Sequence, residues 1–272
     1  MTLQVPRWRT QGLGLAVCLA AAIIAAPAPK ALAQGPMPTL PLPPVDIHDI
    51  SGYWELGLDD RSIPAAVLTS AAARNEPAIR DEDLISQRYC RPLGVPAMMD
   101  PDRPLSIAQG AYEVLITAPV NTAFRHMYFR DKHPNPDIYD PSSVGSSIAH
   151  WEGDTMVVDT IGFHEKNGRM MIPGGGYRTP DSHLTEKFKL IKEGQILSVT
   201  STWKDPKVFA QPHTYEFWYH RINSFYEPRP GIGCNPWDEE RARFLERNFS
   251  PALKKKSDEE MVPPGSAKPG KY

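Results

Sequence analysis

Hydrophobic and polar residues alternate with a period of two along much of the chain after residue 104. Short runs rich in β-branched and aromatic residues are separated by Gly, Pro, Asp or Asn, which is the pattern of half-buried β-strands. A similar run lies earlier, at residues 51–56. The pattern predicts nine strands, of which the later eight span residues 105–109, 112–118, 122–130, 147–152, 155–161, 183–191, 196–203 and 214–222.

Several of these predicted strands are joined by turns of two to four residues, such as Gly153-Asp154 and Lys192-Glu193-Gly194. Short turns favour antiparallel neighbours, and an open sheet of sequential strands would leave two edges unpaired. We therefore predict a mainly β fold. It is either an up-and-down antiparallel β-barrel, lipocalin-like in general shape, or a strongly curved sheet.

Short helices are predicted on both sides of the barrel. Residues 63–74 are rich in alanine with a proline near the first turn, residues 80–88 follow as a second helix, and residues 236–249 carry an apolar stripe at helical spacing. The remaining composition predicts a signal peptide at 1–33, a proline-rich linker at 34–46, one domain at 47–250 and a disordered tail at 251–272.

The first residues have the composition of an export signal. Arg7 and Arg9 precede an apolar run that leads to the small-residue cleavage site Ala31-Leu32-Ala33, so we expect a periplasmic or secreted protein. The run is too short for a comfortable membrane span, and stable membrane insertion is not expected. Cleavage would remove three of the 30 basic residues and none of the 32 acidic ones, which makes nucleic acid a poor partner.

Two of the three cysteines, Cys90 and Cys234, would remain after cleavage. In an oxidising compartment such a pair favours a disulfide, with two separate buried thiols as the alternative. The usual metal spacings are missing from the sequence, and Gly174-Gly175-Gly176 lacks the Lys of a phosphate loop. We expect no metal and no cofactor, and we interpret the glycine run as a flexible loop that could cover the barrel mouth.

A carboxylate falls on the apolar face of one predicted strand. In residues 183–190, Glu186 alternates in phase with Leu184 and Phe188, while His183 falls on the other face. A buried carboxylate needs a partner or a wet cavity. Two interpretations remain: Glu186 is an acid or base in a pocket, or it forms a salt bridge with an inward cation such as Arg125.

The strand at residues 122–130 carries an imidazole and a phenol on one face. His126 and Tyr128 share that face with Phe124, and Arg125 lies on the other. A histidine and a tyrosine can divide proton transfer and oxyanion stabilisation between them. The alternative is that both are satisfied by the backbone in the barrel wall.

Several segments together resemble a family of exported bacterial proteins of unassigned function. The family is marked by a W-E-G-D-T-L-V-V-[DE]-T stretch, and this chain has WEGDTMVVDT at residues 151–160, with CRPLGVP at 90–96 and RHMYFRDKHP at 125–134 in the same order. The resemblance covers residues 47–240. The resemblance implies a small β-barrel and favours a small aromatic ligand, and it implies no mechanism. The chain departs from the family at residues 130–134 and at His213.

The preferred hypothesis is a cofactor-free enzyme that uses general acid-base chemistry on a small, lignin-derived aromatic molecule. Its most concrete form is a lyase that releases formaldehyde by breaking a C–C bond. The catalytic residues assigned on this basis are His126, His183, Tyr128 and Glu186. Substrate binding is assigned to Arg125, His133, His150, Trp151, Trp203 and Tyr215. A carrier or sensor of a small ligand is the alternative from a different class, and a structural envelope protein is a third.

Overall fold

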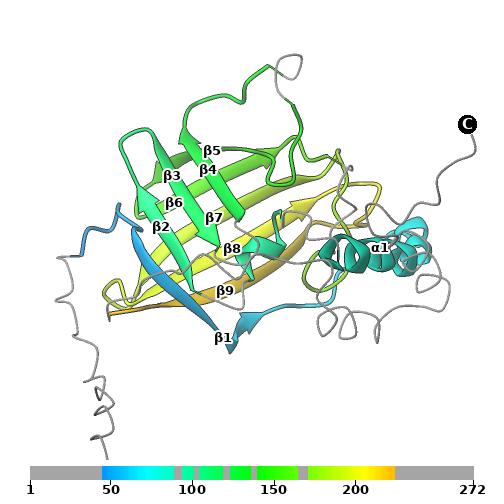
Figure 1. The fold of residues 1–272 in the computed structure, drawn as a ribbon, viewed down its shortest axis with the longest axis horizontal. Coiled ribbons are helices and arrows are strands. Elements are labelled where there is room, and N and C mark those ends of the chain that lie inside the picture. The colour runs from blue at the N-terminus through cyan, green and yellow to red at the C-terminus, as the bar shows by residue number, and fades with distance from the viewer. Residues whose placement is uncertain are drawn as a thin grey trace, which may run out of the picture. The chain divides into compact units, whose positions relative to one another are not determined.

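The described strands form a closed barrel (Figure 1). The computed structural model describes residues 45–88, 94–100, 104–118, 123–135, 140–164 and 171–223, and of residues 81–88 and 123 it describes only the backbone. Within these ranges the barrel order is β1 to β9, the order of the sequence. The strands are β1 (Gly52–Ser62), β2 (Leu105–Gln109), β3 (Glu113–Ala118), β4 (Ala123–Phe129), β5 (Ser146–Glu152), β6 (Thr155–Ile161), β7 (His183–Ile191), β8 (Ile196–Lys204) and β9 (His213–Arg221). The predicted mainly β, barrel-like fold class is confirmed.

The barrel closes because its first strand, β1, pairs with its last strand, β9. Trp54 of β1 pairs with Arg221 of β9, so neither strand presents a free edge along this part of the wall. The tightest hairpin joins β5 to β6, where Glu152 pairs with Thr155 across the two-residue turn Gly153-Asp154. Gly153 has a φ of +61°, a backbone conformation that glycine adopts without steric cost.

One pairing in the barrel is parallel, which the predicted antiparallel meander did not include. Met127 of β4 lies beside Ser147 of β5, with both strands running in the same direction. The chain must therefore return along the barrel between these strands, because a parallel pair cannot be joined by a tight turn. Residues 130–135 and 140–145 are the described parts of this return, and we call them the crossover segment.

A single helix, α1 (Ser70–Arg88), replaces the two short helices predicted before the barrel. It starts later than predicted because tertiary hydrogen bonds hold residues 66–69 in an extended form. Ala66 N donates to Gly174 O (2.9 Å), and Thr69 N donates to Val208 O (2.9 Å). The Thr69 hydroxyl then accepts from Ala72 N (3.1 Å) and caps the helix. The helix continues through Pro77, so residues 80–88 are its last turns.

Large apolar side chains fill the barrel. The biggest of those that are fully buried include Trp54, Trp203, Tyr219, Phe188 and Phe217. A one-turn 3₁₀ helix, η1 (Ala97–Met99), adds Met98 and Met99 to the same core. The Tyr219 hydroxyl donates to Met99 O, which fixes η1 to β9.

Several predictions fall outside the described residues. They concern the signal peptide, nearly all of the linker, Cys90 and Cys234, the helix at 236–249 and the tail at 251–272. The pairing of the two cysteines therefore stays a prediction. In the part of the chain that the structure describes, no helix has both the length and the apolar character needed to cross a membrane.

Candidate functional site

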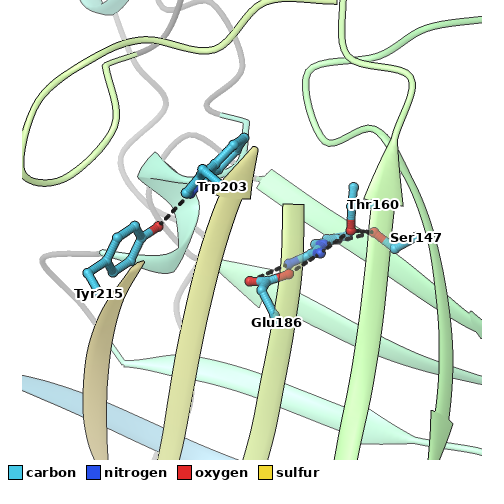
Figure 2. Close-up of polar contacts among 6 residues, drawn as sticks. Ser147, Thr160, Glu186, Trp203 and Tyr215 are labelled. Atoms are coloured by element: carbon cyan, nitrogen blue, oxygen red, sulfur yellow. Dashed lines mark hydrogen bonds and ion pairs between the residues drawn. The ribbon is translucent and has the colours of Figure 1, made fainter. Parts of the chain in front are cut away.

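Inside the barrel, Arg125 of β4 and Glu186 of β7 form a buried ion pair (Figure 2). Their side chains are 0% and 1% exposed. Arg125 donates from Nη1 and Nη2 to the two carboxylate oxygens of Glu186, at 3.2 and 2.5 Å. It also donates to the hydroxyls of Ser147 (3.2 Å) and Thr160 (2.8 Å). Of the two interpretations of Glu186, the salt bridge to Arg125 is the one that the structure shows.

Trp203 and Tyr215 also face the interior, on β8 and β9 (Figure 2). Trp203 Nε1 donates to the Tyr215 hydroxyl (3.3 Å). Burial raises the pKa of Tyr215 well above its ordinary value, and the negative charge of Glu186 acts in the same direction. Tyr215 therefore stays a neutral phenol, and both residues belong to the packed core rather than to an exposed binding surface.

Two of the predicted catalytic residues, His126 and Tyr128, lie on the outer face of β4. His126 Nδ1 is 2.7 Å from Glu113 Oε2 on the neighbouring strand β3. The His126 and Tyr128 rings are nearly parallel, with centroids 5.8 Å apart. The Arg130 guanidinium lies over the Tyr128 ring, 4.3 Å from its centroid. We call His126, Tyr128 and Arg130 the β4 stack.

Two further histidines share one carboxylate on the same outer wall. His133 of the crossover segment places Nε2 at 2.7 Å from Asp159 Oδ1, and His183 of β7 hydrogen-bonds Asp159 Oδ2 through its own Nε2. Asp159 lies on β6, which is paired with β5 on one side and with β7 on the other. We call these three residues the His-Asp-His cluster. Its side chains are 16% (His133), 31% (Asp159) and 40% (His183) exposed, so the cluster is within reach of a small molecule.

The second nitrogens of the two imidazoles differ in exposure. A carboxylate oxygen only accepts hydrogen bonds, so Asp159 fixes the ring proton of each neutral histidine on Nε2. Among the described residues, His133 Nδ1 is buried and has no hydrogen-bond partner. No described residue is a hydrogen-bond partner of His183 Nδ1 either. His183, whose side chain is 40% exposed, is thus oriented by a carboxylate and presents a lone pair on Nδ1, which is the arrangement of a general base. The buried Nδ1 of His133 is out of reach of a substrate.

Strand register relates the cluster to the β4 stack. Tyr128 lies beside Ile148 of β5, and Ile148 pairs with Asp159 of β6, so the three form one row across the outer wall. Adjacent strands are about 5 Å apart, which places Tyr128 about 10 Å from Asp159. His126, Tyr128 and His183 therefore share one outer surface, and only Glu186 faces inward. The predicted catalytic residues do not converge in a barrel pocket.

The hairpin that carries the WEGDT motif has a structural role in the described residues. His150 Nε2 pairs with Glu152 Oε1 (3.1 Å), and both side chains are exposed. Trp151 packs edge-on against His48, with ring centroids 4.9 Å apart. Hydrogen bonds from Lys189 and Thr155 lower the pKa of Asp154. The motif closes a turn. Of the predicted binding residues, Trp151 packs against His48, and His150 lies on the outer face of β5, two residues along the strand from Ile148, where it pairs with Glu152.

Sequence reasoning missed Asp159, the residue that organises the cluster. The signal was present, because Asp159 alternates out of phase with the buried Met156, Val158 and Thr160 and so faces outward. What could not be seen was its neighbour across the sheet. His133 was assigned to binding and His183 to catalysis, and the structure brings both to the same carboxylate.

Comparison with known proteins adds no assignment. No family model matches the chain, and no curated protein sequence is similar to it. The resemblance to the exported bacterial family therefore stays a prediction. Within the described ranges, no group of three or more His, Cys, Asp or Glu side chains is placed to hold a metal ion.

Proposed function

We propose that the protein is an exported enzyme that acts by general acid-base catalysis on a small aromatic molecule, with the His-Asp-His cluster as its centre of proton transfer. The observation that carries the proposal is that Asp159 holds both His133 and His183 by Nε2. An exposed imidazole oriented by a carboxylate, here His183, is suited to a reaction that needs a base and then an acid in the same turnover. This site replaces the barrel pocket of the sequence-based hypothesis.

A lyase reaction would use His183 first as a base and then as an acid. The neutral imidazole takes the proton of a substrate hydroxymethyl group on Nδ1, and the bond between that carbon and its neighbour breaks to release formaldehyde. The bonding electrons form a C=C double bond and expel a hydroxyl group from the next carbon. The His183 imidazolium donates the same proton to this hydroxyl, which leaves as water. The negative charge of Asp159 stabilises the imidazolium, and His133 helps to hold Asp159 in place.

The aromatic substrate class is supported by the surface beside the cluster and by the family resemblance. The rings of Phe124, His126 and Tyr128 line the outer face of β4, and Phe124 is 60% exposed. Aromatic side chains of this kind offer edges and faces against which a substrate ring can pack. A lignin-derived phenol with a hydroxymethyl side chain has both the ring and the leaving groups that the reaction requires.

The test is to incubate the purified protein with lignin-type phenolic dimers and measure formaldehyde and product mass. We expect His183→Gln to lower kcat roughly 10²- to 10⁴-fold, because general acid-base catalysis contributes about that much. His133→Gln should lower kcat less, because His133 only helps to hold Asp159 in place. Glutamine can still donate to Asp159, so binding should change little. A matched control is His220→Gln, since His220 also pairs with an aspartate, Asp60 (3.1 Å), elsewhere on the barrel.

Asp159 touches no substrate in this scheme and acts as a positioning residue. Asp159→Asn should lower kcat and change the pH dependence of turnover, because it removes the charge that stabilises the imidazolium. Asp60→Asn should change neither. If the wild-type protein returns every ligand intact, or if both histidine variants turn over at the wild-type rate, the enzyme proposal fails. Intact return of a tightly bound ligand would instead support the carrier alternative.

A further inference from the structure

The β4 stack has a regular geometry that the proposed proton transfer does not use. His126, Tyr128 and Arg130 are spaced two residues apart, so their side chains leave the same side of the strand. The parallel rings of His126 and Tyr128 and the guanidinium over Tyr128 form a continuous stack along the strand. The guanidinium therefore lies over a ring that carries a hydroxyl, 4.3 Å from the ring centroid.

The β4 stack carries one positive charge, that of Arg130, which no described acidic side chain neutralises. Glu113 is engaged by His126 Nδ1 at 2.7 Å, so this pair accounts for the acid on the neighbouring strand. Arg130 is exposed, and no described residue forms an ion pair with it. No described residue is a hydrogen-bond partner of the Tyr128 hydroxyl. A planar fork of N–H donors beside an O–H donor is complementary to a carboxylate.

The distance between the β4 stack and the His-Asp-His cluster is close to the length of a small aromatic molecule. Tyr128 and Asp159 are in one row of the outer wall, two strands apart, which is about 10 Å. Ile148 lies between them in the row, and its side chain is apolar. An aromatic ring with a short side chain spans such a gap, with its acidic group at one end and its reacting hydroxyl at the other.

We propose that Tyr128 and Arg130 bind a carboxylate of the substrate, so that the substrate class is an aromatic acid. This inference rests on the proposed function and deepens it by naming the group that orients the substrate. The carboxylate accepts from the Arg130 guanidinium and from the Tyr128 hydroxyl. His126, held by Glu113, stacks with the Tyr128 ring.

The experiment compares the binding of 4-hydroxycinnamate and its uncharged methyl ester to the full chain by titration calorimetry. We expect the acid to bind about fivefold to tenfold more tightly than the ester, because an exposed charge-assisted pair is partly screened by water. The preference should shrink at high salt. Arg130→Gln should abolish the preference, Arg130→Lys should retain part of it, and Tyr128→Phe should weaken acid binding while keeping the ring.

Lys132→Gln is the control, since it removes the same charge two residues away in the crossover segment. It should change the preference less than about twofold. Equal binding of acid and ester, equal effects of Arg130→Gln and Lys132→Gln, or no saturable binding of either compound would each overturn the inference. If inorganic phosphate competes as well as 4-hydroxycinnamate does, the site binds anions without selecting an aromatic acid, and the inference is also wrong.

The two proposals fail in different ways. If neutral phenolic dimers are turned over with full dependence on His183 and the acid shows no preference, the carboxylate site is wrong and the enzyme stands. If the acid preference depends on Arg130 but no compound is turned over, the binding site stands and the enzyme proposal is wrong.

Discussion

The ion pair between Arg125 and Glu186 lies wholly inside the barrel, and its disruption should strongly destabilise the fold. Glu186→Gln keeps the shape of the side chain and removes its charge. One of the two carboxylate oxygens that accept from Arg125, at 3.2 and 2.5 Å, then becomes an NH₂ group that faces a donor. The guanidinium, 0% exposed, is left as an uncompensated buried charge. Breaking such a pair costs about 3–5 kcal/mol.

That cost is a large share of the total stability, because a domain of this kind unfolds with a free energy of about 5–15 kcal/mol. The double variant Arg125→Met with Glu186→Leu should be more stable than Glu186→Gln, since it removes both charges together. The hydroxyls of Ser147 and Thr160 lose Arg125 but are 2.9 Å apart, so they can satisfy each other.

The assay is urea unfolding followed by tryptophan fluorescence, with a check that the m-value stays constant. Lys207→Met serves as a surface control, because Lys207 and its partner Asp181 are 75% and 55% exposed, and it should cost less than about 1 kcal/mol. A Glu186→Gln midpoint equal to that of the wild type, or a double variant less stable than Glu186→Gln, would refute the reasoning.

Further variants test the buried phenols and the positive-φ glycines. Burial raises the pKa of Tyr215 and Tyr219, so the native state keeps these protons after the unfolded state loses them, and stability should fall as pH rises above about 10. Tyr215→Phe should reduce that fall, measured by urea midpoints against pH; an unchanged slope would contradict the argument. Gly176→Ala should destabilise more than Gly153→Ala by about 1–3 kcal/mol in the same assay, since only Gly176 has a neighbour, Phe209, 2.7 Å from an added Cβ. Equal losses of stability in the two variants would show that the positive φ, and not the contact with Phe209, sets the cost of the substitution.

Strand positions followed from alternation because each strand has one face in the core. The predicted strand at 155–161 matches β6, and that at 183–191 matches β7. Alternation was less informative for β1, which continues to Ser62 through an irregular stretch after Leu56. There Asp59, Asp60 and Arg61 interrupt the apolar pattern, and only pairing with β9 keeps the chain extended.

The local sequence was equally uninformative about where the helix begins and about the parallel pairing of β4 with β5. Residues 63–69 have good helix propensity, yet hydrogen bonds to Gly174 and Val208, more than 100 residues away, keep residues 66–69 extended. The crossover segment reads as an ordinary polar loop. Its path back along the barrel depends on which strand β5 pairs with, and local sequence holds no information on that choice.

For the candidate site, the alternation of residues along each strand was enough to predict which side chains share a face of that strand. It put His126 with Tyr128, separated Arg125 from both, and placed Glu186 inward, because the period of a strand is two. Which of these side chains meet depends on the fold of the whole barrel. His133, which follows β4 in the sequence, contacts Asp159 of β6, and Asp159 also contacts His183 of β7. Contacts between residues far apart in sequence depend on strand order and register, and these are settled by packing the whole barrel.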